Sequence, residues 1–221
     1  MSRFLIKSLA LACLTIGTLQ ANAATVTYLG SFNGGVGATF AVTTPNVAAS
    51  GSTTAGGFKS SLDGGATSFE TYCVDLYQFV GTSSDYTLVS GASHFVAPHG
   101  NANADIGRLY AYHGLVVDAT SEAAFQLAVW EIAFETTTGP YNLGAGTAQF
   151  TSNAAVTALA SSWLSSLPAL SAFNVQVLES QTHQDLVFAT PAVPEPSTYA
   201  LMAAGLMGVG FVARRRSPKQ R

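Results

Sequence analysis

The residue best suited to covalent chemistry in this chain is a cysteine. The sequence contains Cys13 and Cys73, and Cys13 lies in a segment that we expect to be removed as a signal peptide, which leaves Cys73 alone. Cysteines of exported proteins normally pair, because a free thiol is reactive in an oxidising compartment. An unpaired cysteine in an exported protein is therefore buried and inert, joined to another chain by a disulfide, or used as a reactive group.

A glutamine follows this cysteine at a distance of 53 residues. Residues 71–76 read Thr-Tyr-Cys-Val-Asp-Leu within a predicted strand, and residues 125–130 read Phe-Gln-Leu-Ala-Val-Trp within a predicted helix. This ordered pair resembles the thioester domains of bacterial surface adhesins. In that family an aromatic-Cys-aliphatic strand motif pairs with a Thr-Gln-x-Ala-Ile-Trp helix motif; here Phe125 stands for the Thr and Val129 for the Ile.

The resemblance implies a thioester between Cys73 and Gln126, formed with loss of ammonia. An amine on a surface or matrix target would attack the Gln126 acyl carbon, and Cys73 would leave as a thiolate. Such a protein acts once, as a covalent adhesin, and is not a turnover enzyme. Asp75, Glu131 and His113 are candidates to assist proton transfer, and the sequence does not choose among them.

Two other functions remain open for this cysteine. A cysteine peptidase would need a histidine partner, and the candidates are His94, His99, His113 and His183, but no local peptidase signature surrounds Cys73. The other is a passive surface or matrix protein that binds polysaccharide or protein through exposed loops, with Cys73 buried.

The N-terminal residues 1–23 are typical of a secretory signal peptide. A basic start precedes an apolar run over residues 9–18, and small residues at 21–23 predict cleavage before Ala24. Cys13 would be lipidated in a lipoprotein signal, but its weak spacing favours ordinary cleavage.

The C-terminal residues 194–221 have three parts in a fixed order. Pro194, Glu195 and Pro196 come first, then an apolar run over residues 199–213, then Arg214, Arg215 and Arg216. The run predicts a short transmembrane helix, and the arginines predict that the body lies on the outer side. An ordinary single-pass anchor is the alternative. The arrangement resembles the PEP-CTERM sorting signal, which implies recognition by an exosortase, a membrane processing enzyme.

The body between these ends, residues 24–193, is long enough for one domain with its own core. Lys59 and Arg108 are its only basic residues against eleven acidic ones, so its formal charge is −9. This charge argues against a nucleic-acid partner. No metal-ligand spacing, phosphate loop or dinucleotide fingerprint occurs, so we expect no metal and no cofactor.

The order of predicted elements indicates an α+β fold, with N-terminal and C-terminal strands around a central helical segment. We expect strands at residues 24–30, 37–42, 69–80, 86–89, 173–178 and 185–190, and helices at 104–115, 121–134 and 148–164. Residues 45–65 are predicted to be a mobile loop. Thr120 or Ser121 is the predicted cap of the second helix, whose core stripe would be Phe125, Val129 and Ile132.

Overall fold

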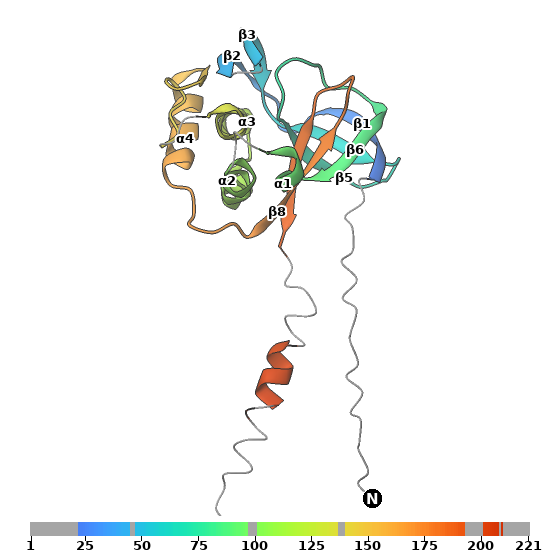
Figure 1. Cartoon of the computed structure of the whole chain (residues 1–221). Helices are drawn as coiled ribbons and strands as arrows, with labels where there is room; N and C mark the ends of the chain where they lie inside the picture. Colours follow the sequence, from blue (N-terminus) through green and yellow to red (C-terminus); the bar gives the residue numbers. More distant parts are fainter. Residues whose placement is uncertain are drawn as a thin grey trace, which may run out of the picture.

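The computed structural model describes residues 22–44, 47–96, 101–136, 140–192, 201–207 and 209 (Figure 1). Its strands are β1 (Asn22–Ser31), β2 (Val36–Thr44), β3 (Val47–Ala55), β4 (Phe58–Leu62), β5 (Ser68–Cys73), β6 (Ser83–Ser90), β7 (Ala148–Thr151), β8 (Phe173–Glu179) and β9 (Leu186–Pro191). Its helices are α1 (Gly91–His94), α2 (Ala102–Leu109), a 3-10 helix η1 (Tyr110–Leu115), α3 (Ala119–Phe134) and α4 (Ala154–Ser165).

Six antiparallel strands close into a barrel in the order β1-β4-β5-β9-β8-β6. The C-terminal hairpin β8–β9 fills the place between β5 and β6, so the two ends of the body share one sheet. A small cluster of buried side chains, with Tyr86, Leu178 and Leu186 among them, comes from the barrel strands β1, β6, β8 and β9. The predicted α+β class is confirmed at this level, as strands that flank a helical segment; closure of the strands into a barrel was not predicted.

The remaining strands form a second sheet of order β3-β2-β7, which packs against α3. Helix α3 also contacts α2, α4 and β5, and every residue from Ser121 to Phe134 is buried. The predicted core stripe is therefore correct but too narrow, because the helix is enclosed on all sides. Its N-cap is Asp118, whose carboxylate accepts the Ser121 N–H at 2.8 Å in a capping box, and not Thr120 or Ser121 as predicted.

Three other predicted segments differ from the structure. Residues 45–65 contain β3 and β4 instead of a mobile loop, because small hydroxyl residues pair with neighbouring strands without an apolar alternation. The predicted helix over 148–164 begins only at Ala154, where Asn153 caps it, and residues 148–151 pair with β2 as β7. The strand predicted over 69–80 ends at Cys73.

Most of the signal segment and most of the sorting tail lie outside the described residues. Of the predicted membrane helix over residues 199–213, residues 201–207 and 209 are described, and they are helical and exposed. This holds for Pro194, Glu195, Pro196, Arg214, Arg215 and Arg216, and for residues 1–21. Within the part of the chain that the structure describes, no helix has the length and apolar character needed to cross a membrane. Both buried clusters draw only on residues from Ala24 to Val187 and their neighbours, so the body has a core of its own.

Candidate functional site

The candidate site lies where the end of β5 meets the first turns of α3. On one side Tyr72 and Cys73 pair with β9, opposite Val187 and Leu186. On the other side the β4 partnership ends at Thr71, so the backbone of Cys73 has no strand beside it there. Buried backbone groups need hydrogen-bond partners, and α3 supplies them.

The Gln126 side chain takes the place of the missing strand. Its Oε1 accepts the Cys73 N–H at 2.9 Å, and its Nε2 donates to the Cys73 C=O at 2.8 Å. Both residues are 1% exposed. The amide therefore lies flat against the backbone of the cysteine with which it was predicted to react, and the predicted pair is in contact.

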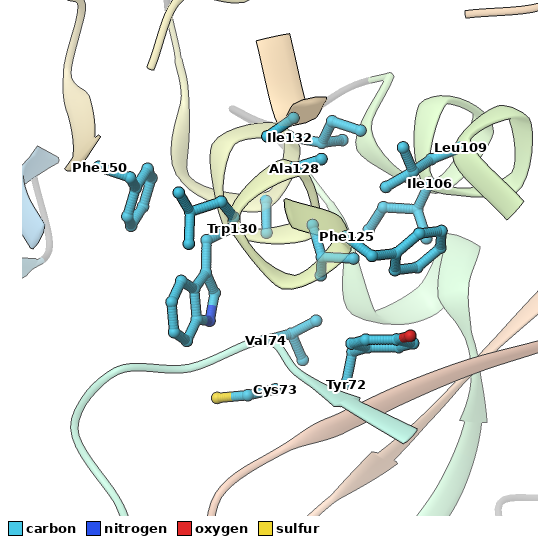
Figure 2. Close-up of a cluster of buried hydrophobic side chains, with 14 of the residues drawn as sticks. Tyr72, Cys73, Val74, Ile106, Leu109, Phe125, Ala128, Trp130, Ile132 and Phe150 are labelled. Carbon is cyan, nitrogen blue, oxygen red and sulfur yellow. The ribbon is translucent and has the colours of Figure 1, made fainter. Parts of the chain in front are cut away.

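The Cys73 thiol is protonated and enclosed. Its Sγ–H donates to the Asp75 carbonyl at 2.7 Å, and burial raises the pKa of the thiol well above its ordinary value. The neighbouring Trp130 side chain stabilises the thiolate and so offsets part of this rise in the pKa of the thiol. Figure 2 shows Trp130 reaching from α3 toward the end of β5, where the sulfur lies. The Trp130 Nε1–H is buried and has no acceptor in hydrogen-bond geometry, so it is available to a developing negative charge.

A pair of buried carboxyl groups lies one helical turn before Gln126. The Tyr72 hydroxyl donates to Glu70 and also lies 3.0 Å from Glu122 Oε2. Burial, together with the neighbouring Glu70, raises the pKa of Glu122 to about 8. The pKa of Glu70 is lowered, because hydrogen bonds from His113, Glu122 and Tyr72 together outweigh its burial. The pair thus holds one proton near neutral pH, on Glu122.

The three candidate assistants occupy different places. His113 binds the carboxyl pair, with Nε2 2.9 Å from Glu70 Oε2. Asp75 accepts the thiol through its backbone carbonyl, while its carboxylate accepts the N–H groups of Tyr77 and Asp185. Glu131 is on another face of α3, where it accepts the Asn142 N–H at 2.8 Å.

Two residues of the site, Glu70 and Glu122, were not predicted from the sequence. Glu122, Gln126 and Trp130 are four residues apart and so share one face of α3, the face that meets β5. Glu70 and Tyr72 alternate along β5 and so share one face of that strand. These two periodicities were visible in the sequence and could have identified the residues once the Cys73–Gln126 contact was assumed.

The alternatives of a cysteine peptidase and of a metal site have less support in the geometry of the described residues. His94 pairs with Glu179 at 2.7 Å and His183 contacts Thr182 at 2.8 Å. Among the described residues no histidine is hydrogen-bonded to Cys73, and His99 lies outside the described residues. The described residues also contain no group of three or more His, Cys, Asp or Glu side chains that could hold a metal ion.

Comparison with known proteins gives one match, at the C-terminus. Residues 192–216 match the model of the PEP-CTERM protein-sorting motif. No curated protein and no solved structure matches the chain, so the thioester assignment of the body stays a prediction. The motif implies processing by an exosortase, and the chain is therefore an exported, exosortase-sorted protein of the cell envelope and surface.

Proposed function

We propose that the body is a single-use covalent adhesin that acts through a Cys73–Gln126 thioester. One observation carries the proposal: the Gln126 amide is hydrogen-bonded through both its oxygen and its nitrogen to the backbone of Cys73. This arrangement holds the Gln126 Cδ carbon beside the residue whose sulfur must reach it. The PEP-CTERM tail delivers such a domain to the surface, where a target could be met.

Thioester formation needs one rotation and one proton transfer. The Cys73 Sγ turns from the Asp75 carbonyl and attacks Cδ, the Cδ–Nε2 bond breaks, and Nε2 leaves as ammonia with the thiol proton. Negative charge develops on Oε1, where the Cys73 N–H already donates at 2.9 Å. The Trp130 Nε1–H is placed to stabilise the sulfur while it carries charge. In the second step a target amine bonds to Cδ and the C–S bond breaks; the proton that the amine nitrogen loses as the amide forms is taken up by the Cys73 sulfur.

The loop that follows Cys73 must move before a target can reach the bond, because Cys73 and Gln126 are buried. Residues 74–82 form this loop, and it presents Phe79 at 90% exposure and Tyr77 at 44% exposure. Exposed aromatic side chains next to a reactive group are suited to recognise a protein or polysaccharide surface.

The experiment is an intact-mass measurement of the body, residues 24–192, before and after treatment with methylamine. The proposal expects a mass lower than that of the sequence by one ammonia, then a methylamine adduct at Gln126 with a free thiol at Cys73. Cys73→Ala and Gln126→Met should each show the full sequence mass and no adduct. Gln149→Met, on the exposed face of β7, is the matched control and should behave as wild type.

A specific observation favours a second candidate, a passive surface or matrix protein. The same Gln126 amide completes the hydrogen bonding of Cys73 where β4 has ended, and this is a sufficient structural reason for a buried glutamine. A wild-type mass equal to that of the sequence, with no adduct after methylamine, would select this candidate.

A further inference from the structure

Strand β3 is an edge of the three-stranded sheet, and its register shows which of its backbone groups face outward. The Thr43 N–H donates to the Thr147 carbonyl on the β7 side, so the even-numbered residues of β2 face β3. Their partners are the odd-numbered residues of β3, such as Ala49 opposite Val42. The N–H and C=O groups of the even-numbered residues of β3 therefore face away from β2: these are Ala48, Ser50, Ser52 and Thr54.

Exposed edge strands usually carry charged residues, prolines or bulges that prevent pairing with another chain, and β3 has none of these. Val47–Ala55 contains no charged residue and no proline, and it stays in register with β2 over its whole length without a bulge. The four residues that face outward are also exposed in their side chains. An uncharged, regular and exposed edge is a template for another strand.

We propose that β3 pairs antiparallel with β3 of a second copy of this chain, about a twofold axis at Gly51. This pairing places Ser50 opposite Ser52 and Ala48 opposite Thr54, so all outward backbone groups find partners. Gly51 meets its own copy at a close, non-hydrogen-bonded position, where the absence of a side chain removes any clash. The two sheets then become one continuous sheet.

The charge distribution favours a second copy as the partner. The body has a formal charge of −9, so two copies repel each other over most of their surface. Residues 31–58, which include β2 and β3, contain no Asp, Glu, Lys, Arg or His. The edge of β3 is thus a place where copies approach without like-charge repulsion.

The position of the edge suits copies that are held in one envelope. β2 and β3 lie at the end of the molecule opposite the start of β8, beside which β9 and the described body end (Figure 1). A strand-to-strand contact alone buries less than the roughly 1,200 Å² of a stable interface, so the dimer is weak in solution. Sorting to one surface raises the effective concentration of the copies and so favours pairing. This inference is independent of the thioester.

The test is sedimentation equilibrium of the body, residues 24–192, over a range of concentrations. Wild type should show a concentration-dependent dimer, and Ser52→Pro should weaken it by roughly tenfold or more, because proline removes an outward N–H. Since that N–H does not bond β2, the unfolding midpoint of Ser52→Pro should stay near that of wild type. Ser52→Ala keeps the N–H and is the matched control; it should dimerise as wild type does.

A second experiment tests the register. In a Cys73→Ala background, a mixture of Ser50→Cys and Ser52→Cys chains should form a disulfide-linked dimer on mild oxidation, well above the yield from either variant alone. A monomer at all concentrations, a Ser52→Pro dimer as tight as wild type, or equal crosslinking by single variants and mixture would each overturn the proposal. The first of these outcomes would leave the edge to an extended segment of another protein.

Discussion

The contact between Gln126 and Cys73 has a measurable free energy that does not depend on whether a thioester forms. In a Cys73→Ala background no thioester is possible, but the backbone N–H and C=O of residue 73 remain. Gln126→Met in that background keeps most of the side-chain volume and removes both hydrogen bonds, at 2.9 and 2.8 Å. Each buried group left without a partner costs about 1–3 kcal/mol, so the unfolding free energy should fall by about 2–6 kcal/mol.

The measurement is urea unfolding of Cys73→Ala and of Cys73→Ala/Gln126→Met, followed by fluorescence of the two tryptophans. Cys73→Ala/Gln149→Met replaces an exposed glutamine and should change the free energy by less than about 0.5 kcal/mol. A Gln126→Met loss as small as that of the control would show that α3 does not complete the hydrogen bonding of β5. The placement of the whole site would then be wrong.

Two further results are expected from the buried carboxyl groups. Burial holds the pKa of Glu122 at about 8 and that of Glu131 at about 7, above the ordinary 4.5, so the folded state keeps protons that the unfolded state has released. Stability should therefore fall by about 5–6 kcal/mol as the pH rises from 5 to 8, and Glu122→Gln should remove more than half of that slope; a flat profile in urea unfolding would contradict these pKa values. Gly57→Ala would place a Cβ 2.5 Å from Glu122 Oε2 and should cost about 1–3 kcal/mol in the same assay. Gly37→Ala, whose Cβ would meet no atom within 4 Å, is its control, and equal effects of the two substitutions would contradict the steric reasoning.

The parts of the fold that could be predicted are those with a local signal. Helix α3 and strands β1, β2, β8 and β9 each carry their own apolar pattern, and their ends agree with prediction to within about two residues. The pairing of Cys73 with Gln126 was suggested only by a resemblance between two short motifs. The structure joins the Gln126 side chain to the Cys73 backbone by hydrogen bonds, and the thioester itself stays a prediction.

The parts that could not be predicted depend on partners distant in the sequence. Strand β3 has a loop-like composition and is a strand because β2 lies beside it in register. The β7 segment, Ala-Gln-Phe-Thr, is too short to show a strand pattern of its own and is a strand because it pairs with β2. The Asn153 cap that begins α4 is a local signal, and the sequence prediction missed it. The Glu70–Glu122 pair joins a strand to a helix 52 residues later, and nothing local to either residue shows that they share a proton.

The position of β9 in the barrel determines how the domain would carry a mechanical load. The sorting tail follows β9, so any tension between the envelope and the body enters the body through this strand. β9 is bonded to β8 over six residue pairs from Phe173–Pro191 to Leu178–Leu186, and to β5 on its other side. A pull along the strand axis loads these hydrogen bonds together, in shear, instead of opening them one after another. A barrel that holds its last strand between two neighbours is thus a tether that resists extraction.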